Sequence, residues 1–82
     1  MRQIILPKLL SDFTDIELIA EGSGIRNLSS LKRQFGGKNW RKKKGKVYIE
    51  DEIGQRRLVE VHWYEAHGVG HVKLKNKTIF RT

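Results

Sequence analysis

Between residues 57 and 75, apolar and polar side chains alternate on both sides of a short glycine-containing connection. Successive side chains of a strand point to opposite faces of its sheet. The alternation therefore predicts a hairpin of two strands with one buried face and one polar face. The residues expected on the buried face are Val59, Val61, Trp63, Val72 and Leu74. The residues expected to share the polar face are Leu58, Glu60, His62, Tyr64, His71, Lys73 and Lys75.

The pattern elsewhere predicts one helix and further strands. Apolar residues three or four apart from Ile25 to Phe35 are typical of an amphipathic helix, which Gly36-Gly37 ends and which Ser23 or Asn27 caps. Alternation over 46–50 predicts another strand, and 51–55 has the composition of a turn. Asn76-Lys77 predicts a tight turn before a short last strand.

The first third of the chain is less regular. Residues 15–21 alternate imperfectly and fit either a strand or the end of a helix. Before them, Ile4-Ile5-Leu6 and Pro7 lead to Leu9, Leu10 and Phe13, whose spacing suggests a short helical turn packed on the core.

Length and composition limit the architecture. Eighty-two residues suffice for a single domain, 1–82, and not for a second core. The predicted fold class is α+β, an antiparallel three- to four-stranded sheet with one main amphipathic helix packed on its apolar face. No apolar run approaches the roughly 20 residues that span a membrane, no secretory leader is visible, and cysteine is absent. These features favour a cytoplasmic protein without a membrane partner or a disulfide framework.

The charge balance points to a polyanionic partner. Seventeen Lys and Arg against nine Asp and Glu give a formal net charge of +8 and an isoelectric point near 10.1, which is typical of nucleic-acid-binding proteins. Six of the nine residues from Lys38 to Lys46 are basic, and the stretch is predicted to be a glycine-bounded loop. Its Trp40 either stacks on bases or anchors the loop in the core. The residues predicted to bind nucleic acid are Lys38, Trp40, Arg41, Lys42, Lys43, Lys44, Lys46, Tyr64, His67 and Lys75.

The polar face of the hairpin also has the side chains that RNA cleavage needs. Attack of a 2′-hydroxyl on its own phosphate requires a base, an acid and positive charge beside the developing oxyanion. His62 is the first candidate for proton transfer, because imidazole titrates near neutral pH. The predicted catalytic residues are His62, Glu60, Glu65, His71 and Lys73. The alternative is that this face only binds, or is simply solvated.

A metal site is the weaker alternative for the same histidines. A set made of His62, His67, His71 and Glu65 matches no standard zinc spacing. His67 is equally placed to serve as a second proton-transfer group or to cap the hairpin. We therefore expect neither a metal nor a cofactor.

Two stretches resemble known proteins. The motif Trp40-Arg41-Lys42-Lys43-Lys44-Gly45 followed by the run from Glu60 to Gly70 looks like that of a family of short, basic bacterial proteins, and no activity comes with that resemblance. The predicted architecture also resembles the RelE and barnase-like ribonuclease toxins, which implies RNA cleavage as a class and assigns no individual residue. The hypotheses are a small metal-independent endoribonuclease of toxin type, a nucleic-acid-binding module without catalysis, and a basic partner of an acidic, antitoxin-like protein.

Overall fold

Five antiparallel strands and one short helix make up the structure, a computed structural model that describes residues 8–80 without the side chain of Thr78. The elements are β1 (Lys8–Leu9), β2 (Thr14–Glu21), the 3₁₀ turn η1 (Gly22–Gly24), α1 (Leu28–Phe35), β3 (Lys38–Glu50), β4 (Arg56–His67) and β5 (Gly70–Phe80). The α+β class is confirmed, and the sheet has more strands than the three to four predicted.

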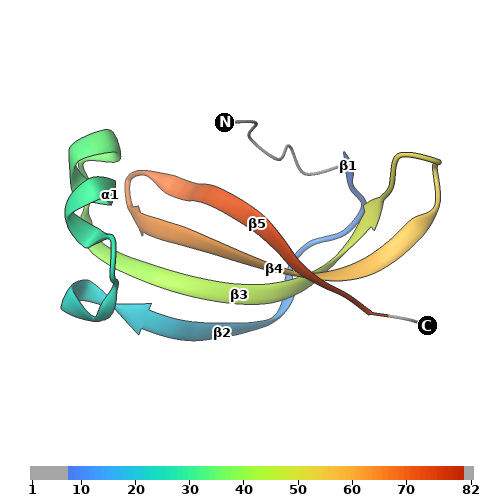
Figure 1. Ribbon diagram of the computed structural model, residues 1–82, viewed down its shortest axis with the longest axis horizontal. Helices are drawn as coiled ribbons and strands as arrows, with labels where there is room; N and C mark the ends of the chain where they lie inside the picture. Colours follow the sequence, from blue (N-terminus) through green and yellow to red (C-terminus); the bar gives the residue numbers. More distant parts are fainter. Residues whose placement is uncertain (1–7, 81–82) are drawn as a thin grey trace.

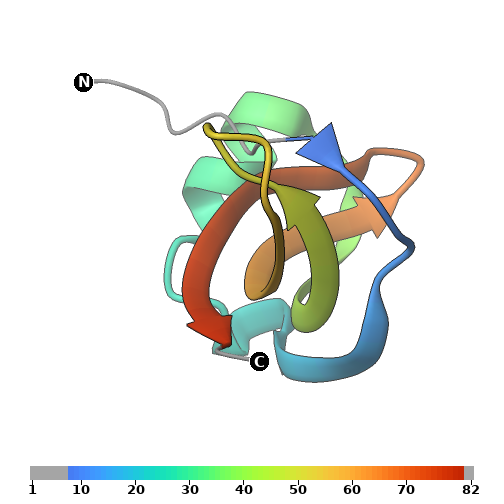
Figure 2. The ribbon, with the colours of Figure 1, turned by 90° about the vertical axis from the view of Figure 1, so that its right-hand side faces the viewer.

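The long strand β3 is the centre of the sheet. On one side it pairs with β1 at its carboxyl end and with β2 over residues 41–46; on the other side it pairs with β4, which in turn pairs with β5 (Figure 1). The view along the long axis shows the strands curling into an incomplete barrel (Figure 2). Such coiling is the accumulated right-handed twist of long antiparallel strands.

The curled sheet has a buried cluster on each of its two faces. One cluster lies away from the helix and consists of Val47, Ile49, Val59, Val61 and Trp63, with Phe13 and Leu74 packed against it. The other lies under α1 and consists of Ile25, Leu31, Trp40 and Ala66, with Ala20, Leu28, Tyr64, Val69 and Val72 packed against it. Along β4, Val59, Val61 and Trp63 therefore face one way, and Tyr64 and Ala66 face the other.

The buried row of β4 was predicted correctly, but its covering was not. Val61 and Trp63 are 0% and 1% exposed, as expected. They are covered by the curl of the sheet and by Phe13, whose ring lies 4.7 Å from that of Trp63, whereas the helix covers the opposite face. The helix is also shorter than predicted, because Ile25 enters the core from the preceding turn and the helix begins at Leu28.

The predicted basic loop, Lys38–Lys46, is instead the first part of the central strand β3. Three of its six charges are paired with a neighbour that the sequence pattern left ambiguous, since residues 14–21 form strand β2. Across this pair, Arg41 meets Glu21 at 3.5 Å, Lys44 meets Glu17 at 3.3 Å, and Lys46 meets Asp15 at 3.6 Å. Opposite charges facing one another on adjacent strands stabilise a sheet.

The remaining local predictions had mixed outcomes. The turn at 51–55 is confirmed, with a carboxylate oxygen of Asp51 accepting hydrogen bonds from the backbone N–H groups of Ile53 and Gln55. The tight turn predicted at Asn76-Lys77 is wrong, because β5 continues through both residues with only an irregularity of its pairing at Lys77. The helical turn predicted over Leu9, Leu10 and Phe13 is also wrong, since Leu9 ends strand β1; Ile4-Ile5-Leu6 lies outside the described residues.

Candidate functional site: a lysine-lined cleft

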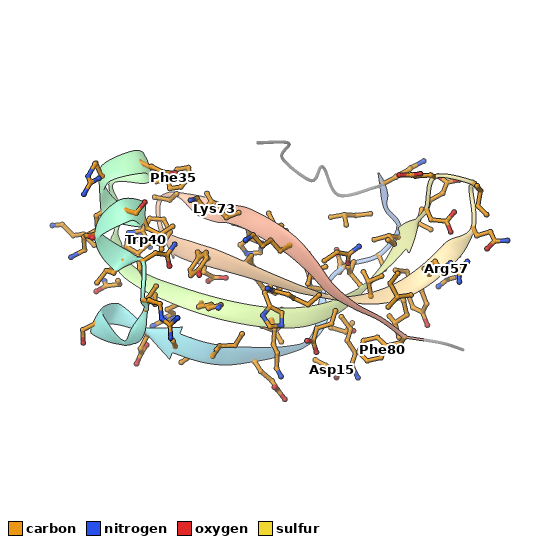
Figure 3. The ribbon with its side chains drawn as sticks, in the orientation of Figure 1. Asp15, Phe35, Trp40, Arg57, Lys73 and Phe80 are labelled. Atoms are coloured by element: carbon orange, nitrogen blue, oxygen red, sulfur yellow. The ribbon has the colours of Figure 1, made fainter. Side chains whose placement is uncertain are left out.

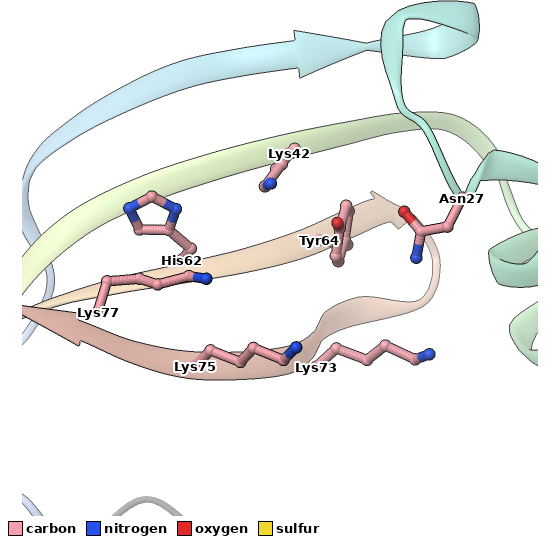
Figure 4. A pocket seen from close by; sticks show the side chains of 7 residues that line it. All are labelled: Asn27, Lys42, His62, Tyr64, Lys73, Lys75 and Lys77. Carbon is pink, nitrogen blue, oxygen red and sulfur yellow. The ribbon is translucent and has the colours of Figure 1, made fainter.

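A cleft of about 200 Å³ lies on the helix-covered face of the sheet, beside the start of α1. Its lining residues come from β3, β4, β5 and the turn before the helix: Lys42, His62, Tyr64, Lys73, Lys75, Lys77 and Asn27 (Figure 4). Asn27 and Lys73 lie at the helix end of the cleft, and His62 and Lys77 lie at the other end. The cleft is therefore lined by four lysines and one histidine.

The four lysines of the cleft differ from Lys43, Lys44 and Lys46 of β3 in their partners. Within residues 8–80, none of Lys42, Lys73, Lys75 and Lys77 has a carboxylate within 4.0 Å, while Lys43, Lys44 and Lys46 each have one. Lys42 instead places its ammonium 5.6 Å from the centre of the Tyr64 ring, a distance at which a cation is attracted to an aromatic ring. Among residues 8–80, the positive charge of the cleft is thus not paired with carboxylates.

An irregularity in β5 brings Lys75 to His62. Tyr64 pairs with Val72 and His62 pairs with Lys75, so two residues of β5, Lys73 and Leu74, stand opposite the single residue Trp63 of β4. Lys73 has a positive φ of 52°, and such a bulge shifts the alternation of the residues after it, here as far as a second irregularity at Lys77. Without the extra residue, Leu74 would take the place beside His62. The bulge therefore packs Leu74 against the cluster that contains Trp63 and places Lys75 in the cleft.

His62 is held by the neighbouring carboxylate of its own strand. Its Nε2 lies 2.9 Å from Oε2 of Glu60, and the two side chains are 20% and 23% exposed. The hydrogen bond from His62 lowers the pKa of Glu60 below its ordinary value, and the charges of Lys44 and Lys46 act in the same direction. An ionised carboxylate only accepts hydrogen bonds, so the proton lies on Nε2 of His62. Nδ1 is then the imidazole nitrogen left for another molecule.

The second predicted histidine, His71, is not near His62. It lies on the opposite face, where its ring stacks on Trp63 at 5.1 Å and its Nε2 lies 3.3 Å from Glu65. Glu65 also accepts a hydrogen bond from Nε1 of Trp63 at 2.9 Å and pairs with Lys43 at 3.1 Å. The prediction that His71 shares the face of His62 is therefore wrong, because the alternation was carried across the bulge at Lys73 without a shift.

The other predicted binding residues are dispersed. Trp40 is 1% exposed and donates a hydrogen bond to the carbonyl of Gly36, so it is the core anchor and not a stacking platform. Figure 3 shows it at the helix end of the sheet with Phe35, whose ring centre is 6.1 Å from its own. His67 and Arg41 line a separate shallow hollow, and Lys38 is paired in register with His67 at the end of β4.

Two cleft residues were missed by the sequence analysis. Lys77 was assigned to a turn, although it continues the every-second-residue spacing of Lys73 and Lys75. Asn27 was considered only as a helix cap. It does occupy the residue before α1, but its side chain makes no capping hydrogen bond and lines the cleft instead.

No protein-family model, curated protein or solved structure was found to match this chain. The resemblances noted above thus stay predictions. Among residues 8–80, no helix is long and apolar enough to cross a membrane. In the same range, no three His, Cys, Asp or Glu side chains come together as ligands of one metal ion, and His62 and His71 lie on opposite faces of the sheet.

Proposed function

We propose that the protein binds RNA in the lysine-lined cleft and cleaves it there through His62. The observation that carries this proposal is a cleft lined by four lysines that have no carboxylate partner among the described residues, together with an imidazole that a neighbouring carboxylate orients. A phosphodiester is the ligand that matches several ammonium groups beside one proton-transfer group.

The four lysines supply binding. Ammonium groups already paired with carboxylates gain little from a phosphate, because the phosphate would have to displace an existing partner. Among the described residues, no carboxylate competes with a phosphate for the four cleft lysines, Lys42, Lys73, Lys75 and Lys77. RNA phosphates entering the cleft release their condensed counterions to solution, which is the main source of affinity for basic sites.

His62 and Glu60 supply proton transfer. Nδ1 of His62 accepts the proton of the 2′-hydroxyl while Glu60 holds Nε2–H and stabilises the imidazolium that forms, as a carboxylate does in a His-carboxylate pair. The 2′-oxygen forms a bond to phosphorus, and the bond from phosphorus to the 5′-oxygen breaks. A cleft lysine stabilises the phosphorane charge and gives a proton to the departing 5′-oxygen. The products are a 2′,3′-cyclic phosphate and a free 5′-hydroxyl.

Binding without cleavage is the second candidate. The hydrogen bond between His62 and Glu60 favours this candidate, because two partly buried polar side chains need such a bond whether or not they take part in catalysis. In that case the cleft retains its affinity for phosphates, and His62 is an ordinary polar contact.

A cleavage assay with end-labelled RNA separates the two candidates. We expect the wild-type protein to give fragments ending in a 2′,3′-cyclic phosphate, and His62→Ala to lower the rate by about 10²–10⁴ with little loss of affinity. His67→Ala is the matched control, since His67 is exposed at the end of β4 and does not line the cleft. Binding without fragments in the wild type would establish the second candidate, and unchanged cleavage by His62→Ala would refute the assigned role.

A further inference from the structure

We propose that Asn27 and Tyr64 form a base-reading subsite at the helix end of the cleft, with a preference for adenine in single-stranded RNA. This inference rests on the proposed function, because it takes the lysine-lined cleft as the site of the RNA backbone. It adds a selectivity that the lysines cannot provide, since contacts to phosphates carry no sequence information.

The amide of Asn27 is free to read a base. Asn27 precedes α1, where an asparagine side chain ordinarily accepts a hydrogen bond from the first turn of the helix. Here it makes no such bond, and its amide lines the cleft. An amide side chain offers one donor and one acceptor side by side. Adenine presents the complementary amino group and ring nitrogen on two edges, whereas cytosine presents them on one edge and uracil has no amino group.

Tyr64 provides an aromatic ring for that base, which would share the ring with the Lys42 ammonium 5.6 Å from its centre. Its ring is half-buried, packed against the cluster under the helix, and it stands next to Asn27 in the cleft (Figure 4). A ring fixed by packing loses little side-chain entropy when it stacks on a base. Single-stranded RNA is commonly read by stacking on an aromatic ring together with hydrogen bonds to the edge of the base.

The spacing of the cleft suits one nucleotide step. His62 and Tyr64 are two residues apart on β4, which places them about 7 Å apart along the strand. A phosphate at His62 and a base at Tyr64 can therefore belong to neighbouring positions of one extended strand. Lys73 lies at the same end as Asn27, where it meets the next phosphate. Duplex RNA has its bases stacked and paired, so its base edges cannot enter this subsite.

Binding of short homopolymers measures the selectivity directly. The probes are fluorescein-labelled 2′-O-methyl oligomers of adenine, uracil and cytosine, whose blocked 2′-oxygens prevent cleavage. We expect the wild-type protein to bind the adenine oligomer on the order of tenfold more tightly than the other two, the lower end of what one bidentate base contact contributes. Asn27→Ser should abolish this preference and leave the mean affinity within a few-fold.

Serine is chosen because it caps helices as well as asparagine does, so α1 should keep its stability while the amide is lost. Asn27→Gly, a second residue tolerated before a helix, should give the same result. Gln34→Ala is the control, since it removes an exposed amide of α1 that bonds Ser30 and does not line the cleft. Tyr64→Leu should weaken binding of all three oligomers roughly tenfold, and Tyr64→Phe should not.

The outcomes separate this inference from the function on which it rests. Equal binding of the three oligomers by the wild type, or an adenine preference that survives in both Asn27 variants, overturns the base-reading subsite and leaves RNA binding in place. Failure of the wild type to bind any oligomer overturns both.

Discussion

The lysines of this protein should contribute very unequally to RNA binding, although their formal charges are the same. Replacing Lys73, Lys75 and Lys77 with glutamine removes three ammonium groups of the cleft that have no carboxylate partner among the described residues. For a single strand, each phosphate contact contributes about 0.7 to the slope of log K against log salt concentration. The triple variant should therefore lower the slope by about two.

A matched variant tests whether position or charge is responsible. Lys43, Lys44 and Lys46 pair with Glu65, Glu17 and Asp15, and replacing all three with glutamine removes the same total charge. Because these lysines already have carboxylate partners, we expect the slope to change by less than about one, a modest long-range effect. Each broken surface pair should cost no more than about 1 kcal/mol of stability.

The assay is fluorescence anisotropy with a 2′-O-methyl oligomer from 50 to 200 mM salt, after circular dichroism has shown that both variants are folded. Between 50 and 200 mM salt, a variant whose slope is smaller by two should lose roughly 16-fold less of its affinity than the wild type. Equal slopes for the two triple variants would mean that only net charge matters. A larger effect from the ion-paired set would mean that the RNA lies elsewhere on the surface.

Three further results follow from the packing and the charges. Val61→Asp places a carboxylate in the cluster on the face away from the helix, and the cost is comparable to the roughly 5–15 kcal/mol stability of a small domain. The circular dichroism spectrum of this variant should therefore be that of an unfolded chain. A folded spectrum would contradict the assigned strand register. Gly37→Ala should lower the melting temperature more than Gly36→Ala, because both have positive φ but only at Gly37 does an added Cβ come within 2.8 Å of Val69, and equal melting temperatures would argue against that contact. Burial opposes ionisation of Glu65, yet hydrogen bonds from its neighbours lower its pKa below the ordinary 4.5. The ionised carboxylate therefore stabilises the fold fully above that pH, and this stabilisation is lost as the pH falls through the lowered pKa. Glu65→Gln should lose less stability on acidification than the wild type, and an unchanged acid-unfolding profile would contradict this role of Glu65.

The buried row of β4 was predictable because strict alternation reports burial on one face directly. Val59, Val61 and Trp63 are all at most 1% exposed, and the polar residues between them include the His62–Glu60 pair of the cleft. The turn at 51–55 was also evident, and so was the connection between β4 and β5, which was expected over 66–70 and is confined to 68–69, since aspartate and glycine occur where the chain reverses.

The assignment of Lys38–Lys46 failed because a run of lysines is normally solvated. In the structure it lies between β4 and the acidic strand β2, whose paired residues are 20 to 32 positions earlier in the chain. The pairing of Glu17 with Lys44 and of Glu21 with Arg41 is a long-range fact, and no local window of the sequence contains it. An acidic alternating segment followed by a basic one was the available signal.

The composition of the cleft could be predicted only in part for a similar reason. Alternation placed four residues together that do line the same cleft, namely His62, Tyr64, Lys73 and Lys75. The reason that Lys75 lies beside His62 is the bulge, which depends on a positive φ at Lys73 and on the burial of Leu74 with Trp63. Alternation without the bulge also placed His71 on the wrong face.

The three histidines are internal probes of the central claim, because each lies in a different part of the structure. His62 lines the cleft, His71 stacks on Trp63 on the opposite face, and His67 lies at the end of β4. The most direct measurement is an NMR titration of the imidazole resonances with a 2′-O-methyl RNA oligomer. We predict that the resonances of His62 shift in proportion to bound RNA while those of His67 and His71 stay in place; shifts at His71 with none at His62 would contradict the assignment of the cleft.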